Sequence, residues 1–572
     1  WMLNRNKKRN ERHRFSLSGV TKYNIFDFLN IQGRMSYERD NSNFRREKYA
    51  SSWLVEMGDY SENISNYEKL YGDILLSFDK KISNFALTAT LGTSFQDEKT
   101  TGLGVSGGGV QFELVPVKKE DGSTANLPTG NVYFPNNFNK NNYYNLGVNE
   151  TYSRSRINSI FGTLQLGYNE MIYLDFTARN DWSSTLAFTS NKHMSFFYPS
   201  VGASFLFNEM FSLDEDIFNL LKARVSYSIV GNALPPYRSY PRHTISGTSI
   251  ASPETMVLTD LKPEKAHSIE AGFDIDLFQN RFHWDVTFYK TNTKNQYFEI
   301  EAPWASGYRY RSINAGNVQN MGIETAIGYR FDLGRNWSWY PTINVSYNKN
   351  EIKELVPGYN EYLLQEAQGV VMLLKEKGAY GDIYTRELLK DENGNLLLDD
   401  NGTPLKSSTR DVYAGNLNAK VHFGWSNTVQ WNNLTFYALI DGKIGGKVVS
   451  MTEAVLDAYG VSKRSGDMRE NGGYINPDGT VVDAQKYFVA TGATSQSSKY
   501  AGMEYIYDAT NVRLRELSVG YTFRNLFGIS KDLTASIIGR NLFFFYKDSP
   551  CDPDTSGSTG NGWQGLDVFN IP

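Results

Sequence analysis

The sequence predicts an all-β protein, a large antiparallel transmembrane β-barrel with long extracellular loops, and three observations lead to that fold class. Aromatic residues make up 14% of the chain although its mean hydropathy is -0.46, which fits strands with one apolar and one polar face. No stretch approaches the ~18 consecutive apolar residues that a spanning helix needs. Alternation of apolar and polar residues with a period of two recurs along the whole chain.

The lack of long apolar segments excludes a membrane protein built from spanning helices. One of the longest apolar runs extends only from Val370 to Leu374, where Lys375 ends it. A chain that spans a bilayer without helices has to form a closed barrel, because lipid offers no water to unpaired backbone groups.

The clearest predicted strand pair covers residues 267–291. Apolar residues such as Ile269 and Phe273 alternate with Glu270 and Asp274 in the first strand, and residues 279–281 form the turn. The second strand alternates in the same way around Phe288. One face of this pair is therefore apolar, and the other carries carboxylates.

About eight such pairs, hence roughly sixteen strands of ~9–11 residues, follow one another along the chain. They are 15–21 with 28–37, 70–78 with 85–91, 160–168 with 172–179, 197–207 with 221–229, 267–277 with 282–291, 323–331 with 337–347, 421–431 with 434–440, and 512–523 with 533–539. Turns within pairs are short, and several connections between pairs are long. This asymmetry is typical of a multi-pass outer-membrane barrel with periplasmic turns and external loops, and it favours that class over a soluble sandwich or propeller.

Aromatic residues gather near the ends of the predicted strands. They are Phe205, Phe207, Trp337, Trp339 and residues 543–546. We expect them to belong to the aromatic girdles that anchor a barrel at the membrane interfaces.

The charge and the reactive residues exclude several other classes of protein. A net charge of -4 argues against a nucleic-acid binder, and the single cysteine, Cys551, cannot form an internal disulfide. The six histidines fall in no zinc-binding pattern, and no nucleophile constellation is present. We expect no catalytic residues, no metal site, no cofactor and no enzymatic activity.

Two weaker motifs have simpler interpretations than ligand binding. Residues 102–107 match GxGxxG, but strand-like residues follow them, so a glycine-rich loop is favoured over a dinucleotide site. Asp391, Asp399 and Asp400 resemble a calcium loop, although the full spacing and the closing glutamate of an EF-hand are absent. The Asn393-Gly394 and Asn401-Gly402 pairs favour hairpin turns, and the sequence leaves calcium binding open.

Several segments, in order along about the last four hundred residues, resemble the SusC/RagA family of TonB-dependent outer-membrane transporters. They are RNDWSSTL (179–186), FFYPS (196–200), NEMF (208–211), LKARVSY (221–227) with Gly231 and Asn232, LKPE (261–264) with Glu270, NAGN (314–317), NMGIE (320–324), Asp441 and Gly442 with Gly445 and Gly446, VRLRELS (512–518), GRNL (539–542) and DPD (552–554).

The resemblance implies a barrel of about 22 strands. About sixteen are visible here, so we expect about five strands before residue 1 and one after residue 572. Residues 1–572 would then be a partial barrel domain, with the N-terminal plug domain and the segment that contacts TonB lying outside this chain.

By the same resemblance, the expected function is active import of oligosaccharides or peptides across the outer membrane. The implied partners are outer-membrane lipid, a SusD-like surface lipoprotein that acts as a lid, and the TonB-ExbB-ExbD complex, which acts through the plug region. The family also suggests a dimer of importer-lipoprotein pairs. A passive porin and a surface-structural or secretion barrel are the alternatives, and a plug sequence would distinguish the importer from both.

Two sets of residues are candidate sites. Trp304, Tyr308, Arg309, Tyr310 and Arg311 lie in one predicted long loop, where rings and guanidinium groups are suited to bind sugars or peptides or, alternatively, to pack the loop or the lid lipoprotein. Five acidic residues are expected to face the lumen, where pairing within the wall or with the plug is favoured over ligand contact. These are Glu270, Asp274, Asp276, Asp285 and Glu324.

Overall fold

The computed structural model describes most of the chain. The described residues are 6–48, 59–108, 112–118, 121–131, 147–190, 194–241, 243–246, 249–257, 260–334, 336–367, 369–493, 500–525, 528, 532–554 and 565–567. The predicted turn residue Arg335 and the last residues, 568–572, lie outside them. Among the described residues, no helix is both long enough and apolar enough to cross a membrane.

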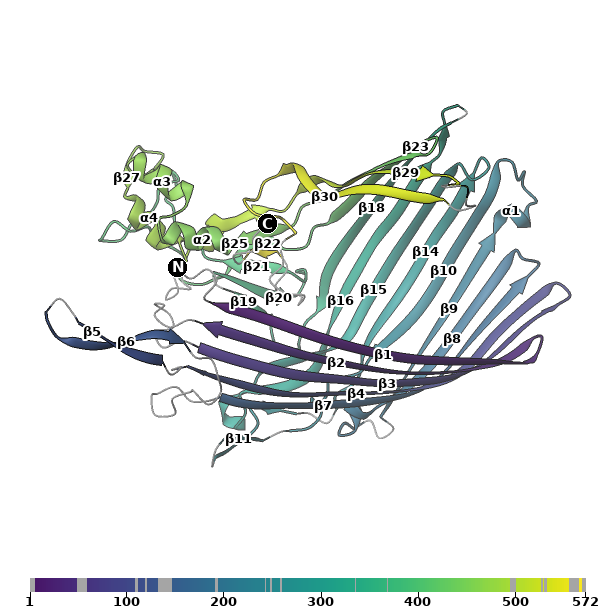
Figure 1. Ribbon diagram of the computed structural model, residues 1–572, viewed down its shortest axis with the longest axis horizontal. Coiled ribbons are helices and arrows are strands. Elements are labelled where there is room, and N and C mark those ends of the chain that lie inside the picture. Colours follow the sequence, from purple (N-terminus) through teal and green to yellow (C-terminus); the bar gives the residue numbers. More distant parts are fainter. Residues whose placement is uncertain are drawn as a thin grey trace.

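One curved sheet, antiparallel except for one short parallel pairing, dominates the structure (Figure 1). Eighteen strands belong to it, and two of these, β13 (Thr255–Met256) and β17 (Phe331–Asp332), have only two residues, which leaves sixteen long strands. The long strands are β1 (Lys7–Phe26), β2 (Leu29–Lys48), β3 (Asp59–Ile82), β4 (Phe85–Gly108), β7 (Gly147–Tyr168), β8 (Ile172–Ser183), β9 (Ser195–Leu206), β10 (Phe218–Asn232), β14 (Glu264–Leu277), β15 (Phe282–Glu301), β16 (Tyr310–Tyr329), β18 (Trp337–Glu354), β23 (Val421–Trp431), β24 (Leu434–Ile444), β29 (Asn511–Phe523) and β30 (Leu533–Lys547).

Each long strand pairs with the next long strand in the chain, so all eight predicted pairs are confirmed. Within the described part of the chain, β1 and β30 form the two edges of this sheet and do not pair with each other. The expected strand length was wrong for several strands, since β3 and β4 each have 24 residues. A crossing takes only ~9–11 residues, so these strands continue pairing well beyond the bilayer.

Short turns lie at one end of the sheet, and long connections lie at the other (Figure 1). Asn169 and Glu170, between β7 and β8, have φ values of 51° and 60°, as tight hairpin turns require, and Asn432 in the turn after β23 has φ 52°. We therefore assign the turns to the periplasmic side and the long connections to the outside, as the sequence predicted.

The long connections carry the shorter elements. They are β5 (Phe112–Lys118), β6 (Thr124–Asn131), η2 (Ser184–Leu186), β11 (Thr244–Ser246), β12 (Ser249–Ala251), η3 (Trp304–Ser306), β19 (Glu361–Ala367), β20 (Val370–Lys375), β21 (Asp382–Thr385), β22 (Val412–Asn416), β25 (Lys447–Ser450), α2 (Met451–Ala458), α3 (Lys463–Glu470), β26 (Tyr474–Ile475), β27 (Val481–Val482), α4 (Ala484–Thr491), η4 (Gly502–Tyr505) and β28 (Ile506–Asp508). At the turn end lies α1 (Phe207–Met210), and β31 (Leu566–Asp567) pairs with β25.

The two faces of the large sheet differ in polarity. Directly paired residues of neighbouring strands share a face, so Ala271, Phe288 and Ile323 lie on one side. Large apolar side chains on this side are exposed, and 49% of Phe288 is accessible. An exposed apolar band of this kind is the surface that a barrel presents to lipid, and the opposite, polar face then lines the lumen.

Rings pair with one another at the turn end of the sheet. Trp337 and Trp431 stack with centroids 5.3 Å apart, and Phe331 and Trp339 with centroids 5.1 Å apart. Phe205 and Phe207 also stack, at 6.4 Å. The predicted girdle positions Phe205, Phe207, Trp337 and Trp339 therefore gather at the periplasmic boundary, where rings anchor a barrel, whereas residues 543–546 lie at the outer end of β30.

The connection between β18 and β23 folds into a domain of its own. Strands β19 to β22 form a four-stranded sheet, and residues 370–374 are buried in it. Val370 and Met372 pack in one apolar cluster with Ile383, whereas Leu374 packs in another with Phe298 of β15 and Ile352 of β18. The apolar run that is too short to span a membrane is thus the core of an external domain seated on the ends of the barrel strands.

Candidate substrate-binding site

A cavity of about 790 Å³ lies where this loop domain meets the outer halves of β15, β16 and β18. This volume falls within the range typical of ligand sites. Asn320 and Asn348 lie on its wall, and the register places both on the same face of the sheet as Glu324. The cavity therefore opens on the polar side of the sheet.

Side-chain amides form much of the cavity wall. Six residues contribute them: Gln296, Asn320, Asn348, Asn350, Asn416 and Asn418. The Asn320 Oδ1 atom accepts hydrogen bonds from the Asn350 amide at 2.9 Å and the Asn348 amide at 3.3 Å. Asn350 in turn accepts a bond from the Tyr380 N–H at 2.6 Å. Because each amide both donates and accepts, such a wall can recognise hydroxyl groups in several orientations.

Asp382 holds the loop side of the cavity together. Its carboxylate accepts hydrogen bonds from the Ala379 N–H at 2.7 Å, the Asn416 amide at 2.8 Å and the Tyr413 hydroxyl at 3.3 Å. Both carboxylate oxygens are thus bonded, and the residue is buried. The Asp382 network fixes the ring of Tyr413 and the amide of Asn416 along the cavity.

The aromatic and arginine residues predicted for ligand contact lie elsewhere, in the connection between β15 and β16. Tyr310 begins β16 and pairs with Thr255 of β13, and the Arg309 guanidinium lies 5.0 Å from the Tyr310 ring centroid. Arg311 follows on β16, and Tyr308 is half-buried. Trp304 belongs to η3, and its side chain lies outside the described residues. None of the five lines the 790 Å³ cavity, and their contact with a ligand stays a prediction.

The five predicted lumen acids all lie on one face. Asp274 pairs with Asp285, Asp276 with His283, and Glu270 with Tyr289 across the β14–β15 ladder. Glu324 of β16 pairs with Thr287, a position of the same face. The register thus brings Glu270, Asp274, Asp276, Asp285 and Glu324 together on the polar side, opposite Phe288.

Cross-strand polar contacts engage three of these acids. Arg224 of β10 forms ion pairs with both Asp274 and Asp285, the second at 3.0 Å. Lys222 lies 3.3 Å from Asp274, and His283 lies 2.5 Å from Asp276. These contacts tie β10, β14 and β15 together, which is a structural role in the wall.

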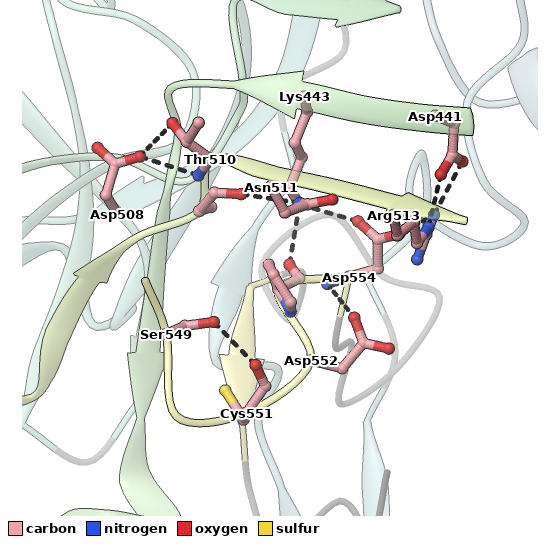
Figure 2. Close-up of polar contacts among 12 residues, drawn as sticks. Asp441, Lys443, Asp508, Thr510, Asn511, Arg513, Ser549, Cys551, Asp552 and Asp554 are labelled. Carbon is pink, nitrogen blue, oxygen red and sulfur yellow. Dashed lines mark hydrogen bonds and ion pairs between the residues drawn. The ribbon is translucent and has the colours of Figure 1, made fainter. Parts of the chain in front are cut away.

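A second charged cluster lies where the chain leaves β30 and folds back over β24 and β29 (Figure 2). Arg513 donates to Asp441 at 2.7 and 3.1 Å and lies 2.5 Å from Asp554. Lys443 lies 3.0 Å from the same Asp554 carboxylate and donates to the Pro553 carbonyl at 2.8 Å. We call residues 548–554 the C-terminal strap. The strap is held to the barrel wall by these two cations, and Arg513 also binds Asp441 of the wall.

The acidic motif at 391–403 forms hairpin turns. Asp391 accepts the N–H groups of Asn393 and Asn395 at 2.8 Å each, and Asp399 accepts those of Asn401 and Thr403 in the same way. Gly394 and Gly402 have φ values of 86° and 73°. The turn interpretation is confirmed. Among the described residues, no group of three or more histidine, cysteine or acidic side chains could hold a metal ion.

Comparison with known families identifies the barrel. A model of the family described as "TonB dependent receptor-like, beta-barrel" matches residues 1–542. The chain belongs to this family. Its members are outer-membrane β-barrels, which places this receptor barrel in the outer membrane, as the sequence predicted.

The receptor barrel is similar in sequence to SusC and to other TonB-dependent receptors. It is 23% identical over 446 residues to "TonB-dependent receptor SusC" of Bacteroides thetaiotaomicron, covering 72% of this chain and 42% of SusC. It is 24% identical over 568 residues to "TonB-dependent receptor P26" of Formosa agariphila, covering 92% and 54%. The chain thus spans about half the length of the curated relatives it matches. These matches confirm the predicted SusC/RagA-type resemblance.

A solved structure shares the fold of the receptor barrel. The "RagAB peptide importer in the 'open-open' state" aligns with a TM-score of 0.76 at 18% identity, covering 98% of this chain and 60% of that one. A likeness at this identity shows that the two barrels have the same architecture.

Sequence reasoning missed the cavity residues of the receptor barrel. Asn320 stood out only as part of a family motif, and nothing in the pattern around Asn348 and Asn350 pointed to a cavity. A weak signal was present, because Asn320, Asn348 and Asn350 lie just beyond the outer ends of two adjacent predicted strands, at positions that continue the polar face. Asn416 and Asn418 come from a loop domain whose position no local pattern gives.

Proposed function

We propose that this chain forms most of the wall of a TonB-dependent importer that takes oligosaccharides or peptides across the outer membrane. The observation that carries the proposal is the polar cavity of about 790 Å³, which opens on the polar face and is framed by external loops. A hydrogen-bonding cavity at this position suits the capture of a hydrophilic nutrient before passage through the lumen. Membership of the receptor family and similarity to SusC support the same function.

The domain arrangement and partners belong to this proposal. We infer that residues 1–572 are a partial barrel domain, and that a plug domain from sequence outside them fills the lumen and contacts the TonB-ExbB-ExbD complex. Two observations support this inference: β1 and β30 are unpaired edges in the part of the chain that the structure describes, and the chain covers about half the length of its relatives. A SusD-like lipoprotein would cover the long loops as a lid, and two importer-lipoprotein pairs would associate as a dimer. Similarity to SusC and to the RagAB peptide importer supports the lipoprotein partner.

Transport rather than catalysis is the proposed activity. Hydrogen bonds join several polar side chains of the cavity, as in the Asp382 and Asn320 networks, and the described residues of its wall form no nucleophile–base pair. Catalysis by a nucleophile requires such a pair within hydrogen-bond reach. The site is thus suited to binding.

Uptake by whole cells tests the function. Native cells with and without the full-length protein would receive a mixture of oligosaccharides and peptides, and mass spectrometry would follow the loss of each from the medium. We expect one class to be depleted only in cells that make the protein, and a protonophore to abolish that depletion. Depletion that persists with the protonophore would indicate a passive porin and would overturn the proposal.

Purification tests the partner. The full-length protein, extracted from outer membranes in mild detergent, is expected to bring a SusD-like lipoprotein with it in equal amount. A barrel that purifies alone under conditions that preserve other outer-membrane complexes would overturn the lid assignment.

A further inference from the structure

The charges of the 790 Å³ cavity are unbalanced. Three lysines line it, Lys349, Lys377 and Lys420, against two acids, Glu351 and Asp382. Glu351 is already engaged, because Lys353 lies 2.6 Å from it and Lys349 lies 3.4 Å from it. The cavity as a whole therefore carries an excess of positive charge.

Lys377 and Lys420 are the cations without a counter-charge. Among the described residues, neither forms an ion pair with a carboxylate. Asp382, the other acid of the wall, has both oxygens bonded to the loop that contains Ala379 and Asn416. A ligand that enters the cavity thus meets two cations that form no ion pair with any described residue, against one carboxylate, Asp382, whose oxygens are already hydrogen-bonded.

Backbone hydrogen bonds to β18 fix the positions of these two lysines. The Lys377 N–H donates to the Ile352 carbonyl at 2.9 Å, and the Lys420 carbonyl accepts from the Asn348 N–H at 3.1 Å. Ile352 and Asn348 are four residues apart on β18, so the two lysine backbones are anchored about 13 Å apart along that strand. From anchor points at this spacing, the two flexible lysine side chains can reach charges on different units of one oligomer.

The rest of the wall favours a saccharide over a peptide. Among the described residues that line the cavity, Val318 is the only aliphatic side chain larger than alanine, so the apolar part of the wall comes mainly from tyrosine rings and lysine methylene chains and not from an aliphatic pocket. The amides and the rings of Tyr380 and Tyr413 offer hydrogen bonds and flat faces, which suit hydroxyl groups and sugar rings.

We propose that this cavity is a binding site for an anionic oligosaccharide, with Lys377 and Lys420 receiving its negative groups and the surrounding amides its hydroxyls. The inference rests on the proposed import function and narrows its substrate class. Lysine binds an anion as a point charge, without the geometric preference of an arginine fork, so carboxylate and sulfate groups are both accepted.

Binding to the full-length protein in detergent tests the inference. The probes are oligogalacturonate, its neutral methyl ester, a sulfated galactan oligomer and an oligoglutamate peptide of equal charge. We expect at least one anionic saccharide to bind about tenfold or more tightly than the neutral ester, and more tightly than the peptide. Its affinity should fall as salt is added. No binding of either anionic saccharide at about millimolar concentration, or equal binding of the ester, would overturn the inference.

Paired variants attribute the effect to the cavity. Lys377→Gln with Lys420→Gln should weaken the anionic saccharide about tenfold or more and leave the neutral ester unchanged. The control is Lys22→Gln with Lys81→Gln, which removes the same charge at the turn end of the sheet. If the control weakens binding equally, net charge is responsible and the cavity assignment falls. If cells import only neutral saccharides by an energised route, the import function stands and this inference fails.

Discussion

Lys443 and Asp554 form an ion pair of 3.0 Å although β29 and β30 lie between them in the sequence (Figure 2). The pair joins the outer end of β24 to the C-terminal strap. Arg513 of β29 forms a second ion pair with the same Asp554 carboxylate. Cys551, the only cysteine of the chain, lies on the same strap. It offers a chemical reporter of whether the strap is docked.

Neutralising Asp554 should expose this cysteine. Burial raises the pKa of the Cys551 thiol to about 11, two units above its usual 9.0, which lowers the thiolate fraction about a hundredfold at a given pH. In Asp554→Asn the strap loses its charge partners Lys443 and Arg513, so we expect maleimide to label Cys551 at least about tenfold faster at pH 7. Asp332→Asn, which also removes a carboxylate paired with two cations but at the turn end of the sheet, is the control. Equal labelling rates in the two variants would contradict the proposed anchoring.

Acid should release the strap by protonating Asp554, which holds it to Lys443 and Arg513. Burial acts to raise the pKa of Asp554, but Lys443 and Arg513 outweigh it and hold that pKa below its usual range. A carboxyl whose pKa is lower in the docked state stabilises docking at all pH values above its ordinary pKa, and this stabilisation is lost as the pH falls through the lowered value. We expect hydrogen exchange in residues 548–554 to stay slow at pH 5–7 and to accelerate below about pH 4. In Asp554→Asn the exchange rate, corrected for its intrinsic pH dependence, should show no such step.

Removing Arg224 should destabilise the wall. Without its guanidinium, Asp274 and Asp285 would face each other across β14 and β15, and Lys222 would be the one described cation still paired with either of them. Arg224→Met should therefore lower the free energy of unfolding by about 1–3 kcal/mol, measured by urea titration in detergent or lipid. Adding Asp285→Asn should restore part of this loss. A double variant no more stable than Arg224→Met alone would show that charge repulsion is not the cause.

The Phe288→Arg variant tests which face of the large sheet contacts lipid. Phe288 lies six residues beyond the start of β15 on the exposed apolar face, so Phe288→Arg should cost about 2–4 kcal/mol of folding free energy near the midplane. Ser346→Arg is the matched control, because Ser346 pairs with Glu324 on the polar face and lines a cavity of about 440 Å³ beside Asp285. We expect the control to fold with near-normal yield. Equal losses in the two variants would reverse or abolish the assignment of faces.

The barrel was largely predictable because its signals are local. Alternation around Phe288 and the tight turn at Asn169 specify strand and hairpin from neighbouring residues alone, and the pairing order follows. The external domain was not predictable in this way. From the sequence, residues 370–374 are recognisable only as a short apolar run. The burial of Leu374 against Phe298 and Ile352 depends on contacts between distant segments.

In the candidate site, too, positions given by local periodicity were predictable and contacts between distant segments were not. The five lumen acids could be placed on one face from periodicity, whereas their partner Arg224 could not, since β10 and β14 are joined by a long connection. The motif around Asp554 was recognisable, but its cations Arg513 and Lys443 come from β29 and β24. Tertiary folding decides these pairs.

Gly322, in the NMGIE segment of β16, has a steric reason to be glycine. A Cβ atom there would lie 2.1 Å from the Tyr347 carbonyl oxygen and 2.7 Å from the Tyr289 hydroxyl, so backbone would have to move. Gly322→Ala should therefore cost about 1–3 kcal/mol, seen as a lower urea midpoint. Gly19→Ala is the control, because nothing lies within 4 Å of its added Cβ. Relief of Gly322→Ala by Tyr289→Ala, which removes the hydroxyl and the ring carbon behind it, would assign the strain to that side chain, whereas no relief would assign it to the β18 backbone, whose carbonyl is the nearer atom.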